Sequence, residues 1–236
     1  MQSGLEILSW SFWSPETREP AKWREAAAQC EHIAVPDHAI PPTHRRRMST
    51  LSKMAVQTAL EATRDARPDF LVFCSQHGEV VRTRELLAAI VAHGELSPTS
   101  FSQSVHNASA GLYTIVSASQ APATSLAAGA GTFAYGWIEV EAFLAGHRDG
   151  RALLVGYDEA LPDEYRPYVD HVQRTYALAL LLGVADSGGL TLESVAADAE
   201  ESLPLAPLFI AWALAATPTF RVTAGGQGWN WRRIGT

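Results

Sequence analysis

Charged side chains are scarce in this sequence. Lysine, arginine, aspartate and glutamate make up 18% of its 236 residues, whereas about a quarter is usual. The 25 acidic residues outnumber the 18 basic ones, for a net charge of −7, so the chain lacks the basic surface that nucleic-acid binding requires. We therefore predict no nucleic-acid partner. The low charge also favours a surface partly covered by a partner subunit, although abundant alanine and glycine would produce the same value.

Cysteines and long apolar runs are also few. Cys30 and Cys74 lie on unrelated segments and form no CxxC motif or disulfide framework, which indicates a reducing, cytoplasmic location. The first residues lack the basic and then apolar pattern of a secretory signal. The longest apolar runs, 176–185 and 205–216, are too short to cross a bilayer as helices, so we predict no membrane span.

No cluster of residues has the spacing of a metal site or a cofactor motif. Four carboxylates crowd one segment: Asp158, Glu159, Asp163 and Glu164. Paired carboxylates can serve acid–base chemistry or hold a metal ion, but the pattern here lacks periodic ligand spacing. A solvated acidic loop is the favoured interpretation, and we expect no metal and no cofactor.

The segment 120–146 organises the chain as a strand, a tight turn and a long buried helix. Residues 124–127 are compatible with a strand, and Gly129 and Gly131 permit strained backbone conformations. Apolar residues from Phe133 to Leu144 recur with a helical period, and Gly146 is placed to end the helix. A strand that enters a helix through small residues has the geometry of a nucleophile elbow. No nucleophile stands at the apex, since Ser125 and Thr132 only flank it.

Apolar periodicity predicts the remaining elements. We expect strands at 4–13, 69–75, 151–156, 175–184, 190–196 and 220–224, and helices at 21–30, 49–65, 80–93, 107–118 and 205–216. Residues 34–44 and 97–107 are expected to be irregular. Residues 186–189 are typical of a hairpin turn between their flanking strands. In the helix at 80–93, the residues expected to face inward are Leu86, Leu87, Ile90 and Val91.

The order of these segments resembles the N-terminal half of a β-ketoacyl synthase, a condensing enzyme of the thiolase fold. The segments that carry the resemblance are Arg45-Arg46-Arg47-Met48-Ser49 with Lys53-Met54-Ala55, Phe70-Leu71-Val72-Phe73-Cys74-Ser75 with Gly78-Glu79, Ser102-Gln103-Ser104-Val105-His106-Asn107-Ala108, the elbow at 124–146, and Ala152-Leu153-Leu154-Val155-Gly156-Tyr157-Asp158-Glu159. The match covers about residues 4–196.

The resemblance implies an α/β fold, a thiolase-like half-fold with a mixed five-stranded sheet between helices. It implies one domain over 1–236, with 197–236 as a C-terminal extension too short to replace the second half of a condensing enzyme. In the family the elbow carries the acyl-accepting cysteine, and that position falls near Gly129 here. The chain therefore resembles the non-catalytic chain-length-factor type of subunit, as in bacterial aryl-polyene pathways, which pairs with a ketosynthase in fatty-acid or polyketide-type biosynthesis.

The resemblance also implies roles for particular residues. The aromatic residues of the elbow helix that would close the partner's acyl tunnel are Phe133, Tyr135 and Trp137. The residues expected at the dimer interface are Ser104, His106, Asn107, Ala123, Thr124, Ser125, Leu126 and Ala127. Contact with an acyl carrier protein, made directly or through the ketosynthase, is assigned to Arg45, Arg46 and Arg47, and a solvated basic cluster is the favoured alternative.

Two other classes of function stay open. A stand-alone acyl hydrolase or acyltransferase would use Ser104 with His106, or Cys74 with His77, although no carboxylate is fixed nearby and an apolar strand usually buries its cysteine. A homodimeric scaffold without an acyl site is the third possibility. Near the C-terminus, Trp229 and Trp231 indicate either an interface or packing of the tail onto its own sheet.

Overall fold

Eight strands form one mixed sheet in the computed structural model, which describes residues 4–23, 39–169, 171–215 and 217–235. The strands are β1 Leu5–Trp13, β2 Phe70–Cys74, β3 Ala123–Leu126, β4 Ala152–Asp158, β5 Tyr176–Val184, β6 Gly189–Val195, β7 Thr219–Ala224 and β8 Gln227–Ile234. Their order is β3-β2-β4-β5-β1-β6-β8-β7. β2 is parallel to β3 and β4, and the other neighbours are antiparallel.

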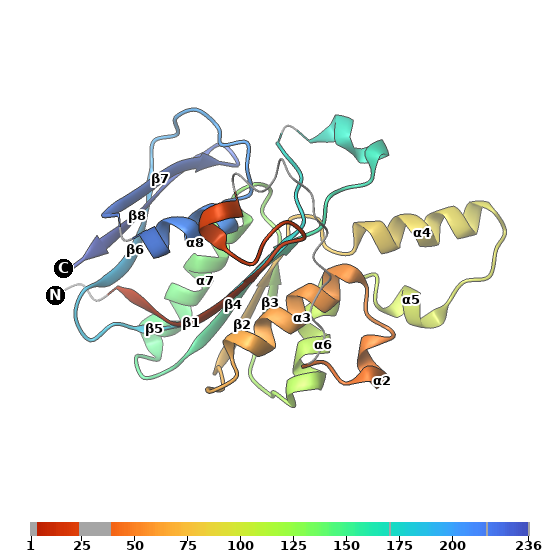
Figure 1. Cartoon of the computed structure of the whole chain (residues 1–236), viewed down its shortest axis with the longest axis horizontal. Coiled ribbons are helices and arrows are strands. Elements are labelled where there is room, and N and C mark those ends of the chain that lie inside the picture. Colours follow the sequence, from red (N-terminus) through yellow and green to blue (C-terminus); the bar gives the residue numbers. More distant parts are fainter. Residues whose placement is uncertain (1–3, 24–38, 170, 216, 236) are drawn as a thin grey trace.

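Helices cover both faces of this sheet (Figure 1). One face carries α3 Thr50–Ala62 and α6 Ala108–Ser117, and the other carries α7 Thr132–Gly146 and α8 Leu205–Ala215. Two further helices, α4 Val80–Val91 and α5 Pro98–Ser102, form an arm that projects from the body. The short turns are η1 Pro20–Lys22, α2 Pro42–Arg45 and η2 Asp163–Tyr168.

The central strands are apolar along their whole length because both of their faces are covered. Every residue of β4 is buried. Leu153 and Val155 belong to the core under α3 and α6, whereas Leu154 belongs to the core under α7 and α8. Successive side chains of a strand point to opposite faces, so one apolar run supplies two cores.

The sheet has eight strands, so the expectation of five was wrong. The additional strands come from β6 and from the hairpin of β7 and β8, which lies in the 197–236 segment. The predicted hairpin between 175–184 and 190–196 was also wrong, because β1 lies between β5 and β6. β1 pairs with β5 along almost its full length, from Leu5 opposite Val184 to Trp13 opposite Ala177. β5 thus pairs with the long strand β1 and not with β6, the neighbour in sequence that the turn residues favoured.

The C-terminal segment covers the elbow helix with aromatic side chains. Trp229 and Trp231 are buried, so the tail packs onto its own sheet rather than exposing these rings. Trp231 meets Trp137 of α7 at a centroid distance of 6.4 Å, and Phe209 of α8 lies 5.3 Å from Phe133. The extension therefore completes the core on one side of the sheet.

The apolar residues of α4 do not face inward, contrary to the prediction. None of the α4 residues is buried, and Leu87, Ile90 and Val91 are 53%, 52% and 80% exposed. Their helical spacing is that of an amphipathic helix, but α4 lies in the arm, away from the sheet (Figure 1). The pattern correctly identified the apolar face of α4. The prediction that this face packs inward, into the core of the chain, was wrong.

Two predicted segments lie partly outside the described residues. The helix expected at 21–30 is described only to Trp23, and the irregular segment at 34–44 only from residue 39, where it ends in α2. The loop expected at 97–107 contains the short helix α5, and the Ser97 side chain caps it by accepting a hydrogen bond from the Ser100 N–H.

Candidate functional site

The elbow is present, and Gly129 stands at its tip. β3 ends at Leu126 and α7 begins at Thr132. Gly129 has a φ of +58°, a left-handed conformation that residues with side chains rarely adopt. A Cβ atom built there would meet nothing within 4 Å. The turn therefore has the shape and the space for a nucleophile but carries no side chain.

The hydroxyl of Thr132 holds the turn in this shape. It accepts a hydrogen bond from the backbone N–H of Ala128 at 2.8 Å and donates one to the carbonyl of Gly129 at 2.6 Å. A hydroxyl with both partners inside the turn stabilises the backbone and is not free to attack a substrate. Thr132 is thus a structural residue of the elbow.

A buried carboxylate lies behind the elbow, at the end of β4. Asp158 accepts hydrogen bonds from the Ser75 hydroxyl at 2.8 Å and from the backbone N–H groups of Gln76 and His77 at 3.2 Å. The Tyr176 hydroxyl donates a fourth at 3.3 Å. Burial raises the pKa of Asp158, and the hydrogen bonds from Ser75, Gln76 and His77 oppose that rise. The carboxylate fixes the turn that follows β2.

Two histidines lie at this turn. The rings of His77 and His171 are parallel, with centroids 6.4 Å apart, and burial lowers the pKa of His77. His171 is hydrogen-bonded to the side chains of Gln76 and Gln173, at 2.9 and 2.7 Å. Between these groups and Gly129 lies a cavity of only about 30 Å³, which is room for about one water molecule. The elbow thus lies beside a small polar cavity.

A larger cleft opens at the carboxyl ends of β2 and β4. Its volume is about 490 Å³, and its lining residues are His77, Glu79, Val80, Thr83, Ser104, His106, Leu161, Tyr165, Tyr168 and Val169. Three segments supply them: the turn after β2 with the first turn of α4, the loop before α6, and residues 161–169, which include η2. Carboxyl ends of parallel strands are where open α/β sheets usually bind ligands.

Two glutamates lie close to this cleft. Glu79 is buried and accepts hydrogen bonds from the hydroxyls of Ser49 at 2.7 Å and Ser52 at 2.5 Å. Burial, together with the carboxylates of Glu79 and Glu85, raises the pKa of Glu159 to about 7. A carboxyl group that titrates near neutral pH is typical of functional sites, so the surroundings of the cleft are electrostatically unusual.

The predicted tunnel residues divide into two groups. Phe133 is 3% exposed and Trp137 is fully buried, and both belong to the chain's own core. Tyr135 is 41% exposed and packs edge-on against Trp229 at 5.1 Å. Only Tyr135 of the three therefore presents a ring on the surface of this chain, and its role in a tunnel stays a prediction.

The predicted interface residues lie at one edge of the sheet. β3 is the edge strand and pairs only with β2 in the described sheet. The other predicted interface residues, Ser104, His106 and Asn107, lie near the end of β3. Ser75 connects the two groups, because its N–H donates to Leu126 O at 3.2 Å and its carbonyl oxygen is hydrogen-bonded to His106 Nε2 at 2.7 Å. Asn107 precedes the first residue of α6 and is exposed. The two groups are thus neighbours in space.

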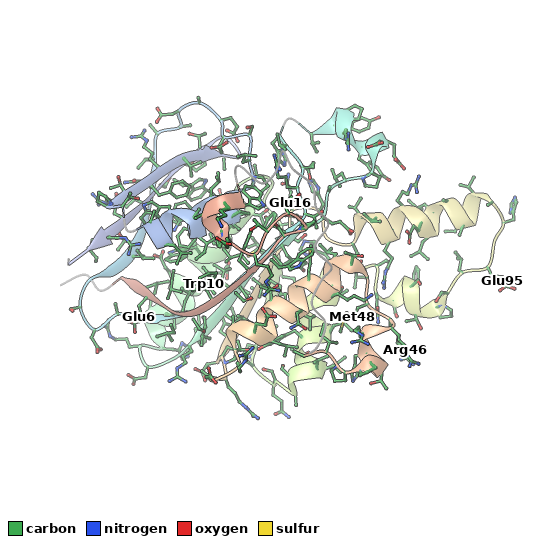
Figure 2. The ribbon with its side chains drawn as sticks, viewed as in Figure 1. Glu6, Trp10, Glu16, Arg46, Met48 and Glu95 are labelled. Atoms are coloured by element: carbon green, nitrogen blue, oxygen red, sulfur yellow. The ribbon has the colours of Figure 1, made fainter. Side chains whose placement is uncertain are left out.

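The three arginines flank α2. Arg45 ends that helix, and Arg46 and Arg47 are exposed. Figure 2 labels Arg46 at the surface, on the same side of the molecule as the arm whose far end Glu95 marks. Arg82 of α4 donates to Arg47 O at 3.2 Å, which holds the basic segment against the arm.

Neither predicted nucleophile pair has the geometry of a catalytic pair. Cys74 is buried, burial raises the pKa of its thiol, and its sulfur lies against Gly136 of α7. Ser104 donates to the carbonyl of Phe101 at 2.8 Å, and His106 bonds Ser75 O. A nucleophile should hydrogen-bond its base, and among the described residues no hydrogen bond joins Cys74 to His77 or Ser104 to His106.

The sequence analysis placed Asp158 in a solvated acidic loop, which was wrong, because Asp158 is the buried last residue of β4. Sequence reasoning also missed His171 and the arm. Asp158 and its partner Ser75 are 83 residues apart, and His171 and Gln76 are 95 apart, so no local pattern connects them. The arm carried a readable signal, because its apolar stripe was detected. The sequence did not reveal that the stripe lacks an intrachain neighbour.

Comparisons with known proteins agree with this architecture. The chain matches the family model of the β-ketoacyl synthase N-terminal domain over residues 10–232. A chain in the solved complex of the ketosynthase ApeO with its chain length factor ApeC, from Xenorhabdus doucetiae, is 29% identical. That match has a TM-score of 0.83 and covers 98% of this chain and 100% of that chain. No curated protein matches the sequence.

More distant structures share the fold. The ishigamide ketosynthase/chain length factor is 14% identical, with a TM-score of 0.60, and the match covers 81% of this chain and 67% of that chain. A β-ketoacyl synthase from Burkholderia phymatum STM815 is 12% identical, with a TM-score of 0.62 and coverages of 84% and 66%. The predicted thiolase-like α/β fold is confirmed. No helix of the described part of the chain is long and apolar enough to cross a membrane.

The match to the family model spans almost the whole chain, and the strand–turn–helix at Gly129 has the geometry of the family's elbow. The chain therefore belongs to the β-ketoacyl synthase family defined by this N-terminal domain.

Proposed function

We propose that this chain is the non-catalytic, chain-length-factor-type partner of a ketosynthase, acting in the cytoplasm in a fatty-acid or polyketide-type pathway of the aryl-polyene kind. The observation that carries the proposal is Gly129: the elbow keeps its left-handed tip and its open space but offers no nucleophile. The likeness to a chain of a ketosynthase/chain length factor complex over its full length supports the same conclusion.

The open edge of β3 is the proposed centre of the heterodimer. The carbonyl of Pro122 accepts a hydrogen bond from the Leu71 N–H of β2 at 2.9 Å, and the carbonyl of Leu126 accepts one from the Ser75 N–H at 3.2 Å. Because backbone groups alternate along a strand, those of Ser125 point to the open side. A strand of the ketosynthase can pair there and remove the exposed edge.

Apolar side chains are exposed on the helices that contact β3 and on the arm. Ile115 of α6 is 61% exposed, and Tyr135 and Ile138 of α7 are about 40% exposed. The arm adds Leu87, Ile90, Val91 and Phe101. Monomeric proteins rarely expose large contiguous apolar surface, so these faces are suited to burial by a partner. The low charge of the whole sequence agrees with such burial.

Product length is proposed to depend on Tyr135, since Phe133 and Trp137 already fill this chain's core. A Tyr135→Ala substitution should lengthen the product by removing a bulky ring from the end of the tunnel. Mass spectrometry of the products of the reconstituted complex measures this. An unchanged product length would exclude Tyr135 as the determinant.

Contact with an acidic acyl carrier protein is proposed for the exposed Arg46 and Arg47. Reversal of either arginine to glutamate should weaken binding of the carrier protein to the complex by about tenfold, with a strong dependence on salt. Arg151→Glu, at the opposite end of the sheet, is the matched control. Equal effects of both changes would point to net charge rather than to a docking site.

Co-expression with the ketosynthase tests the central proposal. The two chains should co-purify and elute together in size-exclusion chromatography. Ser125→Pro, which removes the outward N–H without touching the ladder to β2, should weaken the complex by about tenfold or more, whereas Ser125→Ala should not. A chain that forms only a homodimer, or that turns over acyl thioesters alone, would refute the proposal.

A further inference from the structure

A groove opens on the surface where the sheet divides. In the described sheet β1 and β6 pair only at Leu5 and Leu190, and from there β1 continues beside β5 while β6 continues beside β8. The groove has a volume of about 320 Å³ and is lined by the start of β1, the start of β6 and the ends of α8 and β8. We call it the Trp10 groove and define it by Glu6, Ile7, Trp10, Leu214, Arg233 and Ile234.

The centre of the Trp10 groove is apolar and poorly covered. Trp10 is 39% exposed and Leu214 is 46% exposed, whereas the other six tryptophans of the sequence are buried. A tryptophan ring carries a large apolar area, so leaving one in water gives up stabilisation that the rest of this fold obtains by burial. Tryptophan and arginine are also the residue types that most often dominate the binding energy of protein interfaces.

The walls of the groove carry charges of both signs. Glu6 of β1 is exposed and forms no ion pair or hydrogen bond with another described residue. Arg233 of β8 donates from Nε to the Thr217 carbonyl at 3.3 Å and from Nη2 to the Ala213 carbonyl. Its Nη1 has no partner among the described residues and keeps free donors. The two charges therefore line one groove without pairing with each other.

A surface of this kind is complementary to itself. In a two-fold dimer the same patch lies on both copies, so each contact between two residues occurs twice. A half turn can bring Glu6 of one copy to Arg233 of the other while the apolar centres meet. A small apolar ligand would cover Trp10 but leave both charges unpaired, and a partner of one charge sign would meet a like charge on one wall.

We propose that the Trp10 groove binds the same groove of a second copy of this chain. Trp10 and Leu214 pack at the centre of this contact, and two Glu6–Arg233 ion pairs close its rim. The ion pairs fix the orientation of the two copies more than they add affinity. Since a contact built on one groove is small, the dimer is reversible.

This contact is separate from the surfaces proposed for the ketosynthase. Three strands, β2, β4 and β5, lie between β1 and the edge strand β3. Figure 2 labels Glu6 and Trp10 on the side of the molecule away from Glu95, which marks the far end of the arm. Both contacts can therefore form at once, and the proposal goes beyond the partner role because it joins two heterodimers through this chain.

Analytical ultracentrifugation of the full-length chain tests the proposal. At about 100 μM we expect a reversible dimer of twice the 25.5 kDa mass of one chain. Trp10→Glu should leave a monomer, whereas Leu96→Glu, a similar change at a residue that is 44% exposed near the end of the arm, should leave the dimer intact. A monomeric natural chain at this concentration, or a dimer that persists in Trp10→Glu, would overturn the proposal.

Charge reversal tests the two-fold arrangement. Glu6→Arg should weaken the dimer by about a hundredfold, because both symmetric contacts become repulsive at about tenfold each. Arg233→Glu should do the same, and mixing the two variants should restore the dimer, since opposite charges then meet at both contacts. Glu95→Arg is the matched control and should change nothing. Two folded variants that do not dimerise when mixed contradict the arrangement; if Arg233→Glu does not fold, an unweakened Glu6→Arg dimer contradicts it instead.

The complex with a ketosynthase separates this proposal from the proposed function. We expect two copies of each chain in the complex, and Glu6→Arg should reduce it to one copy of each with the heterodimer intact. A dimer of the isolated chain that Ser125→Pro dissociates and Glu6→Arg does not would place the contact at the β3 edge and refute the proposal. Absence of any ketosynthase partner would refute only the proposed function, because the isolated chain still decides whether the Trp10 groove pairs with itself.

Discussion

Two glycines on either side of the start of α7 should respond in opposite ways to the addition of one methyl group. At Gly129 a Cβ meets nothing within 4 Å, whereas at Gly136 it would lie 2.3 Å from the sulfur of Cys74 and 2.9 Å from Leu154 Cδ1. The elbow tip is empty, and the helix interior is in direct contact with the sheet. Gly129→Ala and Gly136→Ala therefore compare backbone strain with steric overlap.

The expected magnitudes follow from these contacts. Gly129→Ala forces alanine into a left-handed conformation, which costs about 1–2 kcal/mol, and the smaller entropy of the unfolded chain returns up to about 1 kcal/mol. The net loss should be between about 0 and 2 kcal/mol. Gly136→Ala overpacks the core and should lose about 3 kcal/mol. Since each kcal/mol shifts the melting temperature by about 2–4 °C in a chain of this size, scanning calorimetry separates the two.

A double variant checks the cause. Removing the sulfur with Cys74→Ala should make the Gly136→Ala change less harmful. The double variant should therefore lose about 1–2 kcal/mol less stability than the two single variants lose together. Gly129→Cys should add one thiol that iodoacetamide alkylates readily, because the tip is exposed. Equal destabilisation by the two alanine variants, or an unreactive Cys at 129, would refute an open elbow beside a tightly packed helix.

Two further predictions concern charge and the core. Burial and Glu79 raise the pKa of Glu159 to about 7, above its unfolded value of 4.5, so the folded state loses stability as pH rises from 4.5 to 7. Glu159→Gln should therefore be about 3 kcal/mol more stable than the natural chain at pH 8 and equal to it at pH 4, as urea unfolding would show; a constant difference would contradict the shift. Trp137→Ala should cost about 3–5 kcal/mol, whereas Tyr135→Ala should cost under about 1 kcal/mol, and similar losses would contradict their different burial.

Much of the local structure was predictable because it depends on neighbours in the sequence. The buried strands at β2, β4 and β5 are continuous apolar runs, and α3 begins where the Ser49 side chain accepts from the Ser52 N–H. The elbow was predictable from small residues between a strand and an apolar helix. Gly129 was identified because only glycine adopts its conformation without strain.

The partners of each element were not predictable, because pairing depends on competition across the whole chain. The turn at 186–189 favoured a hairpin, yet β1 provides a longer apolar partner for β5, and β6 pairs with β8 instead. The inward face assigned to α4 had the correct period but no core to meet. An apolar pattern indicates which face of a helix or strand avoids water, but it does not indicate which surface covers that face.

The sequence by itself determined the alternation of strands and helices, the emptied elbow at Gly129 and the absence of a basic surface. Those properties are set by residue type and spacing within one segment. Only the tertiary structure decided that the sheet has eight strands, that Phe133 and Trp137 fill the chain's own core, and that Asp158 and His106 meet the turn after β2. Each of these depends on residues far apart in sequence, which the burial of two apolar cores brings together.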